Sequence, residues 1–77
     1  MTYRDAVTAR LALIDARIAE TARGIRITGY RILDALTEQR CEAARCWCAH
    51  EHQLAEDLML LYRLSDRLAD KLELIQS

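Results

Sequence analysis

Apolar residues in the first third of the chain recur at alternating steps of four and three. The series has one polar position, Thr21. Its apolar members are Val7, Leu11, Ile14, Ile18 and Ile25. This spacing places them on one face of an amphipathic helix. Thr2 and Asp5 have the spacing of a capping box, and Gly24 suits the position just beyond a helix C-terminus. We therefore predict a helix over about residues 3–23.

The segment 24–29 is the predicted connector. It contains both glycines of the chain, and Thr28 is suited to cap a following helix. One alternative is a continuous helix with both glycines inside it, at a cost of about 1 kcal/mol each relative to alanine. A turn is favoured because the heptad phase changes here. The apolar series of the first third would continue through Thr28 and Ile32, whereas the series that follows the connector uses Tyr30 and Leu33.

From residue 30 to residue 76 the sequence contains no clear helix-stopping signal. The last third carries the strongest apolar series, which only Ser65 interrupts: Leu54, Leu58, Leu61, Leu68, Leu72 and Ile75. In residues 37–53 the pattern weakens, and Trp47 is the one large apolar residue in phase with that series. The sequence therefore predicts either one long second helix or two helices with a break near residues 49–53.

These lengths predict an all-α helical hairpin with a long second helix. A first helix of about 21 residues covers only half of such a partner, which leaves a leucine-rich stripe larger than monomers tolerate. We expect coiled-coil-like association into a dimer or higher helical bundle, with another copy or another helical protein. The predicted interface residues are Leu54, Leu58, Leu61, Leu68, Leu72 and Trp47. The alternative is a closed three-helix bundle within one chain.

Composition narrows the classes of function. The 77 residues fit a single domain, 1–77, and a formal net charge of −1 argues against binding nucleic acid non-specifically. The sequence lacks a membrane-spanning stretch and a signal-peptide pattern, so we expect a cytoplasmic protein that does not enter membranes. Three cysteines do not make a closed disulfide framework and suit a reducing compartment.

One short segment gathers the residues most suited to chemistry. Residues 41–52 hold all three cysteines, both histidines and the only tryptophan. Thiolate and neutral imidazole are ligands that zinc and copper prefer. The predicted ligands are Cys41, Cys46, Cys48, His50 and His52. Buried cysteine and solvated histidine are the competing interpretation, since the spacing matches no standard zinc pattern.

Motifs typical of enzymes are absent from the sequence, including the glycine-rich phosphate loop, G-x-S-x-G and H-E-x-x-H. We therefore predict a small protein–protein interaction or assembly module that acts through its apolar helix faces and needs no cofactor. The alternative is a helical protein that binds Zn or Cu through the cluster at 41–52.

Overall fold

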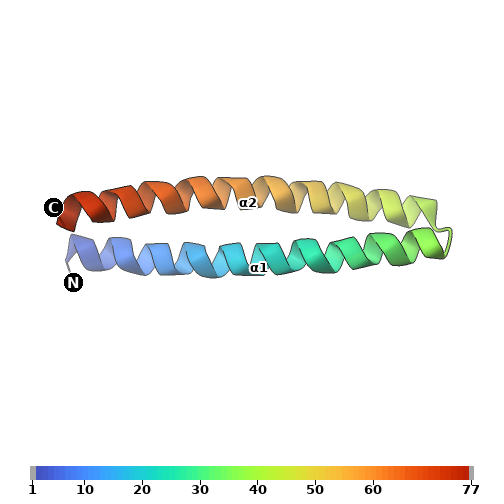
Figure 1. Cartoon of the computed structure of the whole chain (residues 1–77), viewed down its shortest axis with the longest axis horizontal. Coiled ribbons are helices and arrows are strands. Elements are labelled where there is room, and N and C mark those ends of the chain that lie inside the picture. Colours follow the sequence, from blue (N-terminus) through green and yellow to red (C-terminus); the bar gives the residue numbers. More distant parts are fainter. Residues whose placement is uncertain (1, 77) are drawn as a thin grey trace.

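Two long antiparallel helices make up the fold in the computed structural model, which describes residues 2–76 (Figure 1). Helix α1 spans Tyr3–Thr37 and helix α2 spans Cys41–Gln76. The start of α1 and the end of α2 lie together, and the turn lies at the opposite end. The predicted all-α class is confirmed, and the described residues contain no strand. The three-helix alternative is wrong, because α2 continues without a break through residues 49–53.

The predicted start of the first helix is confirmed at the level of its hydrogen bonds. The Asp5 amide donates to Thr2 Oγ1 over 3.1 Å, and the Thr2 amide donates to Asp5 Oδ2 over 3.3 Å. The two residues thus form a reciprocal capping box, with Thr2 as the N-cap. This box satisfies two amides near the N-terminus that lack a partner within the helix.

The predicted turn at 24–29 is wrong, and so is the predicted helix end near residue 23. α1 runs through both glycines, and neither has a positive φ. The Thr28 hydroxyl does not cap a new helix. It donates to the Gly24 carbonyl over 2.7 Å, which satisfies this hydroxyl although Thr28 is buried. The apolar series of the first third continues inward through Thr28 and Ile32, whereas Tyr30 and Leu33 are exposed.

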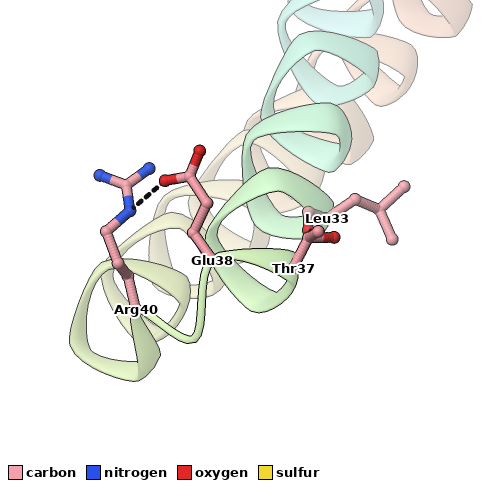
Figure 2. A network of polar contacts seen from close by, with 4 residues as sticks. All are labelled: Leu33, Thr37, Glu38 and Arg40. Carbon is pink, nitrogen blue, oxygen red and sulfur yellow. Dashed lines mark hydrogen bonds and ion pairs between the residues drawn. The ribbon is translucent and has the colours of Figure 1, made fainter.

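The chain reverses at residues 38–40 instead (Figure 2). Gln39 takes the left-handed conformation, with φ of 58°. The Arg40 amide donates to the Ala35 carbonyl over 2.7 Å, and the Gln39 amide donates to the Leu36 carbonyl over 3.1 Å. This pair of bonds is a Schellman motif, which closes a helix C-terminus. Arg40 Nε also lies 2.8 Å from Glu38 Oε2 across the turn.

Each helix turns one continuous seam of residues toward the other. All members of the two seams are buried or half-buried. The seam of α1 consists of Val7, Leu11, Ile14, Ile18, Thr21, Ile25, Thr28, Ile32 and Ala35. The seam of α2 consists of Ala44, Trp47, Glu51, Leu54, Leu58, Leu61, Ser65, Leu68 and Leu72. Both keep alternating steps of three and four, which is the spacing of coiled-coil packing.

Contacts between the helices fix their register. Gly24 faces Leu54, Gly29 faces Glu51, and the Ser65 hydroxyl lies 3.4 Å from Asp15 Oδ1. In each pair the two residues lie about equally far from the turn. α1 has 35 residues and α2 has 36. The prediction that the first helix covers only half of the second is therefore wrong, and the C-terminal leucines are packed within the chain.

The core between the seams is thin. The molecule measures 56 × 16 × 14 Å, so it is a single layer of two helices. Among residues 2–76, the buried apolar ones are Val7, Ala35 and Ala44, and no large side chain is fully buried. Within the described part of the chain, each helix packs against one other helix, and the sides of both helices remain open to solvent.

Candidate interaction surfaces

All six residues predicted to form an interface lie on the seam of α2. Leu54, Leu58, Leu61, Leu68, Leu72 and Trp47 are half-buried there. Leu54 meets Gly24, and Leu61 lines one hollow together with Arg17 and Thr21 of α1. These residues thus hold the hairpin together. Their contact with a second chain stays a prediction.

Trp47 is in contact with two polar side chains, one from each helix. The guanidinium carbon of Arg31 lies 5.7 Å from the centre of the indole ring, within the range of a cation–π contact. The His50 ring meets it edge to face, with 5.9 Å between ring centres. These contacts cover Trp47 at the end of the core where the aliphatic seam is weakest.

The two long sides of the hairpin differ in charge. One side, here called the arginine flank, carries Arg10, Arg17 and Arg31 of α1 with Asp57 and Lys71 of α2. Arg10 and Lys71 line one shallow hollow beside Leu68, and Arg17 and Asp57 line another beside Leu61. An apolar partner on this flank would have to desolvate these charges, which is costly without compensating partners.

On the opposite side, the row of residues directly beside the two seams, here called the alanine flank, is almost uncharged. It includes Asp15 and Gly29, which contact Ser65 and Glu51 of the α2 seam. Ala55 and Ala69 follow those two seam residues by four positions and therefore lie along the same edge of α2. The seven-residue spacing of the seams assigns the following residues to this flank: Asp15, Ala22, Gly29, Leu36, Cys48, Ala55, Tyr62 and Ala69. Asp15 is its only acidic or basic side chain.

Large apolar side chains remain exposed on the outside of the hairpin. Among residues 2–76, twelve of them have more than a third of their surface accessible, and Met59 is 58% exposed. They are Tyr3, Leu13, Ile27, Tyr30, Leu33, Leu36, Met59, Leu60, Tyr62, Leu64, Leu74 and Ile75. The predicted interface did not include these residues, because it followed only the strongest series on each helix. The signal available in the sequence was the second apolar residue beside many seam positions.

The cysteines and histidines of residues 41–52 spread around the first turns of α2. All five predicted ligands are exposed. His52 Nε2 lies 3.1 Å from Glu56 Oε1, the residue one turn further along the helix. Within residues 2–76, no three or more His, Cys, Asp or Glu side chains gather closely enough to hold a metal ion. Binding of Zn or Cu, including by a site shared between two chains, stays a prediction.

Neither a search of the helices for a membrane span nor a comparison with known proteins assigns a function to this chain. Neither helix, over the described residues, is long and apolar enough to cross a membrane. The chain matches no protein-family profile, no curated protein and no solved structure at a significant level.

Proposed function

We propose that this chain is a helical assembly module that acts by associating with further copies of itself. The observation that carries this proposal is the area of its surface. The hairpin exposes 6099 Å². A compact folded monomer of the same 8.9 kDa mass is expected to expose about 4,800 Å². The excess is about 1,300 Å² per chain.

That excess has the size of a stable interface between subunits. If each of two chains buries about 1,300 Å², the complex buries about 2,600 Å² in total, which lies within the range of obligate homodimers. The exposed apolar side chains supply the chemistry for such burial. Stacking two hairpins gives every helix a second neighbour and produces a four-helix bundle.

The solution mass tests this proposal directly. We expect light scattering coupled to gel filtration to give at least twice the 8.9 kDa chain mass at micromolar concentration. The helical signal should melt at a temperature that rises with chain concentration, because association stabilises the folded state by mass action. A mass equal to that of one chain up to millimolar concentration, with a melting temperature independent of concentration, would overturn the proposal.

A further inference from the structure

One stripe on the outside of α2 carries its charges in a definite order. It consists of five exposed residues spaced seven apart: Arg45, His52, Met59, Asp66 and Glu73. The members lie on one side of the helix, because seven residues make almost two whole turns. Each of the first four precedes a residue of the alanine flank by three positions, so the stripe borders that flank. We call it the charge-ordered stripe.

The charge-ordered stripe is complementary in charge to the same stripe of a second copy that runs in the opposite direction. Its basic and imidazole members lie on the turn side of Met59, and its acidic members lie on the terminal side. If two stripes meet antiparallel with Met59 against Met59, Arg45 faces Glu73 of the second copy and His52 faces Asp66 of the second copy. Within one chain Arg45 and Glu73 are about 42 Å apart along the helix, so they cannot pair there.

The charges of helix α1 indicate the same central level, that of Met59 on α2. On the same side of the hairpin it carries two charged residues near its middle, Asp15 and Arg26, both exposed. Their midpoint lies about as far from the turn as Met59 does on α2. A two-fold axis through that level therefore also brings Asp15 of one copy toward Arg26 of the other. The two helices thus indicate the same axis to within about two residues.

We propose that two copies stack through their alanine flanks, antiparallel, about a two-fold axis at the level of Met59. This inference rests on the proposed self-association and specifies its surface. Small side chains such as Ala22, Ala55 and Ala69 let the helices approach closely, and Met59 and Tyr62 supply apolar area at the centre. The charged pairs lie at the rim, where they select the orientation more than they add affinity. The arginine flanks remain in solvent.

The proposed dimer also separates the two cysteine–histidine clusters. Cys48 lies eleven residues from the axis at Met59, so Cys48 of the two copies would be roughly 30 Å apart. A metal ion held jointly by the clusters of two copies is incompatible with this arrangement. The two ideas can therefore be tested against each other.

Cross-linking tests the axis. In a chain whose three exposed cysteines are replaced by alanine, Met59→Cys should give a covalent dimer on mild oxidation with oxidised glutathione. Leu60→Cys is the matched control, since Leu60 is 56% exposed, next in sequence and directed away from the alanine flank. We expect Met59→Cys to form at least tenfold more disulfide-linked dimer than Leu60→Cys. Equal yields, or a higher yield from Leu60→Cys, would overturn the proposed axis.

A charge exchange tests the orientation independently. Arg45→Glu alone, or Glu73→Arg alone, should weaken dimerisation about tenfold, because each creates two like-charged contacts per dimer. The double variant should return to within about threefold of the original affinity. Arg45 lies 3.5 Å from Glu42 in its own chain, and Glu73→Arg cannot restore that contact. Rescue would therefore report contact between copies, and a double variant as weak as the single ones would contradict the orientation.

The outcomes separate this inference from the proposed function. A chain that is monomeric under all conditions removes both. A chain with the mass of a dimer that shows neither selective cross-linking nor charge rescue removes only the antiparallel alanine-flank arrangement. In that case self-association stands and another surface carries it.

Discussion

The hairpin has two halves with the same backbone and different cores. The terminal half, residues 2–23 and 55–76, is held by aliphatic seam residues such as Ile14, Leu61 and Leu68. In the turn half, residues 24–54, half of the seam residues are small or polar, namely Thr28, Ala35, Ala44 and Glu51. Regular helical packing therefore does not require a uniform core. The seam spacing fixes which faces meet, and the volume of the side chains determines how strongly the faces hold.

The largest effects are expected from two substitutions that reverse the difference between the two cores. One removes apolar volume from the terminal half, and the other adds apolar volume to the turn half. Leu61→Ala should lower the free energy of unfolding by about 2 kcal/mol, the low end for a leucine because it is only half-buried. Glu51→Leu should raise the free energy by about 1 kcal/mol, because it replaces a half-buried carboxylate with apolar volume. Urea unfolding followed by circular dichroism at one fixed chain concentration measures both. Effects of the same sign would refute the contrast between the halves.

A smaller effect is expected at the turn itself. Gln39→Gly should stabilise the hairpin by about 1 kcal/mol, since a side chain at φ of 58° is strained and glycine is not. Glu38→Gly is the matched control and should not stabilise, because Glu38 has φ of −86°. The midpoint of thermal unfolding, at equal chain concentration, compares the two. A lower midpoint for Gln39→Gly than for the original chain would show that the turn does not depend on this conformation.

The smallest effect is expected inside α1. Gly29→Ala should stabilise the helix by about 0.5–1 kcal/mol through helix propensity, because the nearest atom to an added Cβ is Glu51 Oε2 at 3.8 Å. Gly24→Ala should gain less, since its Cβ would lie 3.4 Å from Leu54 Cδ1. Urea unfolding again gives the comparison. Destabilisation by Gly29→Ala would indicate a bend at this residue.

The sequence predicted the helical class, the capping box at Thr2 and the inward faces of both helix ends. The predicted position of the turn was wrong because the glycines and Gln39 occupy positions opposite to their usual preferences. The glycines, which usually end helices, lie within α1, whereas the left-handed turn position is occupied by Gln39. The uninterrupted series through Thr28 and Ile32 was the better guide, since packing overrides local preference. The exposed flanks were not predicted, because the strongest apolar series on a helix identifies the face that packs and does not show which other face stays uncovered.

The register of the hairpin has a consequence for the order in which its contacts form. Gly29 and Glu51, near the turn, close a short loop, whereas Val7 and Leu68, which line one hollow near the ends, close a loop of roughly 60 residues. The longer closure costs about 1 kcal/mol more in chain entropy. Loop entropy thus favours the turn half as the first to form, and apolar burial favours the terminal half as the last to open. The fold is thus expected to start at the turn end of the molecule and to last longest at the terminal end.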